Sequence, residues 1–132
     1  MSTDPNVASS SQGALLVVED EELVRSYVTM VLESGGHEVL QAKDGLMAVS
    51  MFEAALDRVA VVILDLTLPR LKGLEVAARI RALRPMMPII LMSGSHDPAL
   101  PAEMTQTAPT TFLAKPFRPD ALLAKVRQML AP

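Results

Sequence analysis

Short apolar runs alternate along the chain with longer segments in which apolar residues recur every three or four positions. The short runs predict strands, and those that are almost wholly apolar are typical of strands covered by helices on both faces. We expect strands at Ala14–Val18, Glu38–Gln41, Ala60–Leu64, Ile89–Met92 and Thr111–Ala114. This alternation favours repeated strand–helix units around a parallel sheet.

The longer segments carry helix signals. The first has an apolar stripe at helical spacing, formed by Leu23, Val24, Tyr27, Val28, Val31 and Leu32. Gly35–Gly36 should stop that helix, and Asp44 is placed to cap the next one. A third helix should end before Pro85, because the residue preceding a proline is pushed out of the helical region. The last helix should open with Pro119 in its first turn.

Two stretches depart from this pattern. Residues 1–12 are polar, serine-rich and aperiodic, so we expect a flexible leader before a domain that covers residues 13–132. Between the fourth and fifth strands, three prolines limit any helix to a short or irregular one over residues 102–106. With right-handed crossovers, the remaining units form an α/β fold, a doubly wound five-stranded parallel sheet with helices on both faces.

Composition narrows the classes of function. A chain of 132 residues suits one domain, and no apolar stretch nears the roughly 20 residues of a membrane span. With no secretory signal either, a cytoplasmic protein is the default. The absence of cysteine excludes disulfides and thiolate chemistry, and any metal site should use oxygen ligands. A charge of -3 and 3% aromatic residues argue against direct nucleic-acid binding.

Unusual polar residues fall where the predicted strands end. Glu19-Asp20 follow the first strand, Asp65 the third, Ser93 the fourth and Lys115 the fifth. In a doubly wound sheet the ligand site lies outside these carboxyl ends. Neighbouring carboxylates repel unless a cation lies among them, and an oxygen-lined cluster suits Mg²⁺. A carboxylate beside Mg²⁺ and a lysine could attack phosphorus without a side-chain base, since it is already ionised near neutral pH.

Four segments, each at a strand end, resemble the receiver domains of response regulators in two-component signalling. They are the acidic cluster VVEDEE, the block VILDLTLPRLKGLE, the hydroxyl segment LMSGS and the Lys-Pro segment FLAKPF. The resemblance covers Ala14–Leu130 and implies a flavodoxin-like fold with strand order 2-1-3-4-5. DLTLP, LMSG and the proline-rich segment resemble receivers of hybrid histidine kinases more than those of transcription factors.

The resemblance also implies residue roles. Asp65 would be the phospho-acceptor and a ligand of Mg²⁺ or Mn²⁺; Asp20 would bind the metal directly, Thr67 through its backbone carbonyl, and Glu19 through a water molecule. Glu19 stands where the family more often has aspartate.

Further residues match the family's switch. Lys115 would bond to the phosphoryl group, Ser93 would be the switch hydroxyl and Phe112 the aromatic switch residue. The Lys115–Pro116 bond would be cis, and Gly73 fits the turn into the third helix.

The implied function is that of a switch, with no catalysis beyond self-phosphorylation and autodephosphorylation. A histidine kinase or a histidine phosphotransfer protein would donate the phosphoryl group, and the output partner is open. We expect a monomer or weak dimer, either a stand-alone regulator or the receiver of a hybrid kinase.

Two other interpretations of the function remain open at this point. One is a receiver-like interaction module that phosphorylation does not switch, motivated by Glu19 and the proline-rich segment. The other is an aspartyl-phosphate phosphatase of the haloacid-dehalogenase type, which would need an acid where Thr67 stands.

Overall fold

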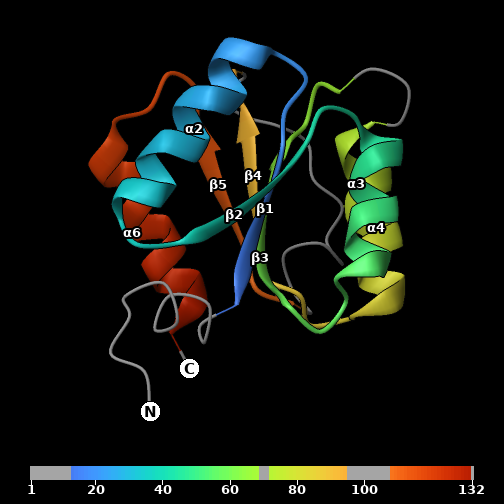
Figure 1. Ribbon diagram of the computed structural model, residues 1–132. Coiled ribbons are helices and arrows are strands. Elements are labelled where there is room, and N and C mark those ends of the chain that lie inside the picture. The colour runs from blue at the N-terminus through green and yellow to red at the C-terminus, as the bar shows by residue number, and fades with distance from the viewer. Residues whose placement is uncertain (1–12, 69–71, 95–107, 132) are drawn as a thin grey trace.

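The computed structural model is described here for residues 13–68, 72–94 and 108–131, and it contains one parallel sheet. The strands are β1 (Ala14–Val18), β2 (Glu38–Ala42), β3 (Val59–Asp65), β4 (Ile89–Ser93) and β5 (Thr110–Ala114). Their order across the sheet is β2-β1-β3-β4-β5 (Figure 1). The expected strand order is therefore confirmed, and predicted strand ends differ from observed ones by one residue or none.

Helices cover both faces of this sheet. Helices α2 (Glu22–Ser34) and α6 (Pro119–Leu130) lie on one face, and α3 (Gly45–Ala54) and α4 (Gly73–Leu83) lie on the other (Figure 1). The α/β fold class expected from the sequence is thus confirmed.

Strand residues alternate between two apolar cores, because successive side chains point to opposite faces of a sheet. In β1, Leu16 and Val18 pack in the core beneath α3 and α4, whereas Leu15 and Val17 pack beneath α2 and α6. The same alternation runs through β4, and through β3 from Val61 onward, where all the apolar residues are fully buried. This two-sided burial explains why these three strands read as continuous apolar runs.

The helix ends follow the signals in the sequence. The side chain of Asp44 accepts a hydrogen bond of 2.8 Å from the backbone N–H of Met47 and so caps α3. Gly36, with φ 89°, ends the turn after α2, since glycine adopts this conformation without steric cost. Helix α4 ends before Pro85, and Pro119 is the first residue of α6.

Two sequence expectations lie outside the described residues: the leader over residues 1–12 and the short helix over residues 102–106. The apolar stripe lies on α2 as predicted, and Leu23, in the first turn of that helix, is its most exposed member at 85%.

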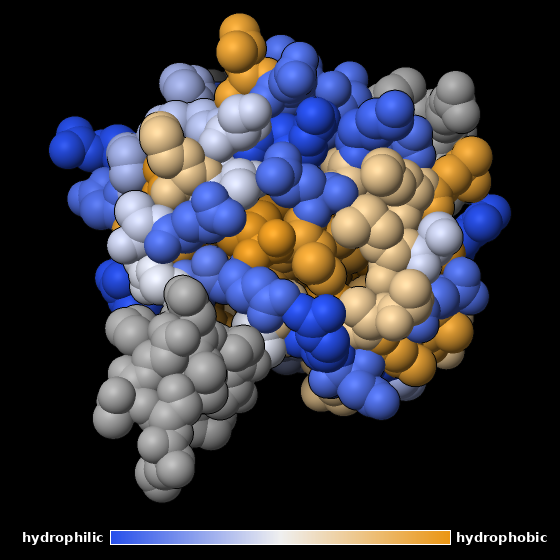
Figure 2. Space-filling view, in the orientation of Figure 1, coloured by the Kyte–Doolittle hydropathy of each residue, from blue (hydrophilic) through white to orange (hydrophobic). Residues whose placement is uncertain are grey.

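Hydrophilic residues cover much of the face seen in Figure 2, and hydrophobic ones gather between α2 and α3. The edge strand β2 crosses the same face in Figure 1, and its Val39 and Leu40 are only half-buried. In the part of the chain that the structure describes, no helix is long and apolar enough to cross a membrane.

Candidate functional site

Four parallel strands bring the predicted site residues to one edge of the sheet. Asp65 is the last residue of β3 and Ser93 the last of β4, while Glu19-Asp20 and Lys115 directly follow β1 and β5. The pairing of Val18 with Leu64, and of Ser93 with Ala114, aligns these strand ends. Residues up to 96 positions apart in sequence therefore meet at the carboxyl edge.

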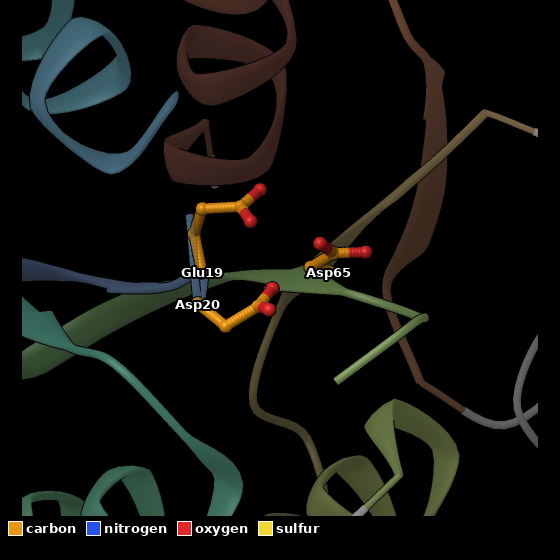
Figure 3. Close-up of side chains that lie close together, drawn as sticks. All are labelled: Glu19, Asp20 and Asp65. Carbon is orange, nitrogen blue, oxygen red and sulfur yellow. The ribbon is translucent and has the colours of Figure 1, made fainter. Parts of the chain in front are cut away.

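Three carboxylates form the centre of this site. Glu19, Asp20 and Asp65 each place a carboxylate oxygen within 4.8 Å of the other two. Figure 3 shows the three side chains at the ends of β1 and β3, where Glu19 and Asp20 point to opposite sides of the end of β1 and Asp65 lies beside them. Glu19 and Asp65 are buried, whereas Asp20 is exposed. The cluster therefore has two fixed, desolvated members and one that faces solvent.

Lys115 supplies the positive charge at this cluster. Its Nζ donates to Oε1 of Glu19 at 2.7 Å and to Oδ2 of Asp65 at 3.0 Å. Burial alone would lower the pKa of Lys115, but the bonds to the two carboxylates outweigh burial and raise the pKa above its usual value. The ammonium group thus stays charged at neutral pH and bridges β1 and β3 from the end of β5.

Asp65 is held ionised. Its Oδ1 accepts hydrogen bonds from the backbone N–H of Thr67 at 2.9 Å and from the Thr67 hydroxyl at 3.0 Å. Burial works to raise the pKa of Asp65, but the bonds from Thr67 and Lys115 lower it below the usual value. An ionised carboxylate is the form that can act as a nucleophile.

Glu19 has the opposite balance. Burial raises its pKa from 4.5 to about 6, although the bond from Lys115 and the bond from the backbone N–H of Glu21 act to lower it. Two buried carboxylates thus share one lysine, and one of them retains a proton more readily. A cation bound among these oxygens would compete with the proton on Glu19.

Arg25 also contributes to this site, although its sequence position did not mark it. From α2, the guanidinium of Arg25 donates to the backbone carbonyl oxygen of Glu19 at 2.9 Å. The contact ties the first turn of α2 to the loop that carries the acidic residues. An arginine six residues after Glu19 has no distinguishing sequence signal.

Gly73 lies at the site for a reason other than the one that the sequence suggested. It begins α4 and has no positive φ, so a turn conformation does not require glycine there. A Cβ at this position would lie 2.5 Å from the carbonyl oxygen of Asp65 and 2.7 Å from Cα of Leu66. Glycine is thus needed because α4 begins in direct contact with the end of β3.

The remaining predicted residues lie in positions compatible with the proposed roles. Ser93 is buried at the end of β4, and Phe112 is half-buried on β5. The Lys115–Pro116 peptide bond is cis, as the resemblance implied.

The donor set fits a hard divalent cation. Every candidate ligand atom is a carboxylate or carbonyl oxygen, and Mg²⁺ prefers such oxygens together with water. The exposed Asp20 leaves one side of the cluster open to solvent, where bound water could complete the coordination.

The sequence and the fold of this chain have relatives among known proteins. Residues 15–127 match the family model described as "Response regulator receiver domain". The chain is 33% identical over 116 residues to the response regulator MprA of Mycobacterium avium (strain 104). The match covers 88% of this chain and 50% of MprA. It therefore spans about half the length of the curated relatives that it matches.

Solved structures with the same fold include proteins of two-component signalling. The Vibrio cholerae chemotaxis protein CheY4 superposes with a TM-score of 0.78 at 29% identity, covering 89% of this chain and 98% of that one. The receiver domain from the hybrid histidine kinase CckA superposes with a TM-score of 0.77 at 31% identity, covering 90% and 100%.

Proposed function

The chain belongs to the response regulator receiver domain family, and on that premise we propose that it is the phospho-acceptor switch of a two-component phosphorelay. Asp65 takes the phosphoryl group in a reaction that depends on a divalent metal ion. Receiver domains of this family accept phosphoryl groups in two-component signalling; the acceptor residue, the metal dependence and the donor are the parts that we propose.

The observation that carries the proposal is the pairing of an ionised Asp65 with Lys115. Oδ2 of Asp65 accepts from the ammonium group at 3.0 Å, while Thr67 holds Oδ1. When Oδ2 attacks phosphorus, the bond from phosphorus to the donor atom breaks and that atom leaves with its electron pair. Lys115 is close enough to transfer its bond from the carboxylate to a phosphoryl oxygen, which neutralises charge as it gathers there.

The metal would be held by the carboxylates of Asp20 and Asp65 and the backbone carbonyl of Thr67, with Glu19 acting through a water molecule. When bound, Mg²⁺ or Mn²⁺ supplies further positive charge to the phosphoryl oxygens and lessens the repulsion among the carboxylates. Glu19 differs from the commoner aspartate by one methylene, and its carboxylate accepts a hydrogen bond from Lys115 at 2.7 Å. Arg25 and Glu21 hold the Glu19 loop in place.

Ser93 and Phe112 would convert phosphorylation into a change of surface. A phosphoryl group adds charge and strong acceptor oxygens at Asp65. The Ser93 hydroxyl, at the end of the neighbouring strand, would move toward such an oxygen. Phe112, half-buried on the next strand, would repack into the space that Ser93 leaves. The partner-binding face then changes because one of two conformations becomes more populated.

An apolar groove next to Lys115 supports a protein as phosphodonor. The groove has a volume of about 410 Å³ and is lined by Leu23, Val24, Tyr27, Lys115, Pro116 and Phe117. The rings of Tyr27 and Phe117 lie 6.3 Å apart, and Leu23 is 85% exposed. A helical histidine kinase or histidine phosphotransfer protein could bury these side chains and bring its phosphohistidine to Asp65.

Intact-mass spectrometry with acetyl phosphate tests the proposal. The wild-type chain should gain one phosphoryl group when Mg²⁺ is present and none when the metal is chelated. Asp65→Asn should gain none, whereas Asp44→Asn, which changes a carboxylate outside the site, should gain one. No adduct on wild type, or an equal adduct on Asp65→Asn, would contradict the proposal and favour an interaction module that phosphorylation does not switch.

A further inference from the structure

A second cavity lies at the opposite end of the molecule from Asp65. It has a volume of about 590 Å³ and lies where the turn after α2 meets the last turns of α6, helices that run side by side in Figure 1. Its lining consists of Gly35, His37, Leu123, Arg127, Leu130 and Ala131. This volume is within the range of small-molecule sites, which run from about 300 to 1,000 Å³.

Two nitrogen-bearing side chains line this cavity, and its described lining residues include no carboxylate. Arg127 comes from α6 and His37 from the turn before β2. Within the described residues, Arg127 has no carboxylate at ion-pair distance, although Arg58 and Arg118 each have one. The guanidinium therefore offers a fork of N–H donors that no acidic group in the described part of the chain occupies.

His37 adds a neutral donor beside that charge. Burial, and then the nearby charge of Arg127, lowers the pKa of His37 below its usual value. Its imidazole is therefore mainly uncharged at neutral pH, and its ring N–H can donate one hydrogen bond. One fixed cation and one neutral donor suit a single carboxylate better than a dianion.

The other side chains that line the cavity are apolar. Leu123, Arg127 and Leu130 recur at helical spacing, so one face of α6 supplies both the charge and two leucine side chains. Gly35 permits the close approach of the α2 turn, since a Cβ there would lie 2.8 Å from Cδ2 of Leu123 and 3.4 Å from the His37 ring. The cavity thus combines a cationic part with an apolar floor.

The carboxyl end of α2 opposes an anion less strongly because three of its last four carbonyl groups already accept hydrogen bonds. The backbone N–H groups of Gly35, Gly36 and His37 donate to the carbonyl oxygens of residues 31–33. The dipole of α6 is sufficient to favour a cation in its last turn and so explains the charge of Arg127. The dipole does not explain the cavity that Arg127 lines.

We propose that this cavity binds a small amphipathic monocarboxylate, with its carboxylate on Arg127 and His37 and its apolar tail against Leu123 and Leu130. The site is separate from the phosphorylation site, and the inference does not depend on the proposed function. Binding there would give the chain an input that requires no phosphodonor.

Hexanoate is a suitable probe, and hexanamide, with the same tail and no charge, is its matched control. Amide spectra of the ¹⁵N-labelled full chain should show saturable shifts for Gly35, His37, Leu123 and Arg127 with hexanoate, and much weaker ones with hexanamide. Arg127→Gln should weaken hexanoate binding about tenfold, the effect of losing one charge-assisted hydrogen bond. Arg118→Gln removes an exposed arginine before α6, paired with Asp120, and should leave binding unchanged.

Unchanged spectra of both variants outside the cavity would show that they fold as the wild type does. If Arg127→Gln disturbs the fold, His37→Asn replaces it as the test variant. Shifts that do not saturate, equal binding of hexanamide, or equal binding by Arg127→Gln and Arg118→Gln would overturn the proposal.

Discussion

Replacing Gly73 by alanine should damage phosphoryl transfer far more than it damages folding. The new Cβ would lie 2.5 Å from the carbonyl oxygen of Asp65, whereas ordinary contacts begin at 3.4 Å. The start of α4 and the end of β3 must therefore separate by about 0.9 Å, and both neighbouring atoms at Asp65 and Leu66 belong to the backbone and cannot rotate away.

The effects on stability and on rate should differ in size. Overpacking costs about 1–3 kcal/mol, but alanine is about 1 kcal/mol better than glycine in a helix, so the net loss of stability should be about 2 kcal/mol or less. A displacement of about 1 Å at a reacting group can cost about 100-fold in rate. We thus expect Gly73→Ala to fold. It should accept phosphoryl groups from acetyl phosphate about 10- to 100-fold more slowly than the wild type.

The assay pairs urea unfolding with the initial rate of adduct formation measured by intact mass. Gly94→Ala is the matched control, because a Cβ at Gly94 meets no atom of the described residues within 4 Å. Its stability should stay within about 0.5 kcal/mol of wild type, and its rate should stay close to that of wild type. A Gly73→Ala protein that reacts at the wild-type rate would refute the view that this contact positions Asp65.

Three other substitutions test separate parts of the account. Asp44→Ala removes the side-chain cap of α3 and should lower the free energy of unfolding by about 1 kcal/mol in urea titrations, with no change in phosphorylation; an unchanged unfolding midpoint would show that the cap contributes nothing. Lys115→Met removes the charge beside Asp65 and should slow phosphorylation by acetyl phosphate about 100-fold; a rate close to wild type would exclude the proposed role of the lysine. Glu19→Gln tests the pH dependence of stability. The pKa of Glu19 in the folded state is raised from 4.5 to about 6, so the folded state binds the proton more tightly than the unfolded state does. Without metal, the wild type therefore loses stability as the pH rises from 4.5 through about 6. Because Gln does not titrate, the unfolding free energy of the variant relative to wild type should increase by up to about 2 kcal/mol between pH 4.5 and 7; parallel pH profiles would contradict the raised pKa.

Much of the fold could be predicted from the sequence because local signals agree with the tertiary structure. Strands buried on both faces must be apolar throughout, and Asp44 and Pro119 mark helix starts by local hydrogen bonding and backbone geometry. The gathering of carboxylates also follows from topology, since parallel strands end at the same edge. Exposure was harder to predict: Leu23 fits the apolar periodicity of α2, but periodicity does not reveal how far a helix extends beyond the sheet.

The internal connections of the site required the structure. The bond between Lys115 and Glu19 joins residues 96 positions apart, and their spacing does not specify which carboxylate the lysine contacts. The contact of Arg25 with the Glu19 carbonyl depends on the position of α2 against the loop. The close contact of Gly73 with Asp65 depends on where α4 begins against β3, which sequence alone suggested only as a turn.

Reduction of the phosphorylated chain with borohydride tests whether Asp65 is the phospho-acceptor. The reagent converts an aspartyl phosphate to homoserine and leaves unmodified aspartate unchanged, so peptide mass spectrometry can locate the acceptor. We expect homoserine at position 65 alone, formed only when Mg²⁺ accompanied acetyl phosphate. Homoserine at another position, or an adduct that borohydride does not reduce, would contradict it.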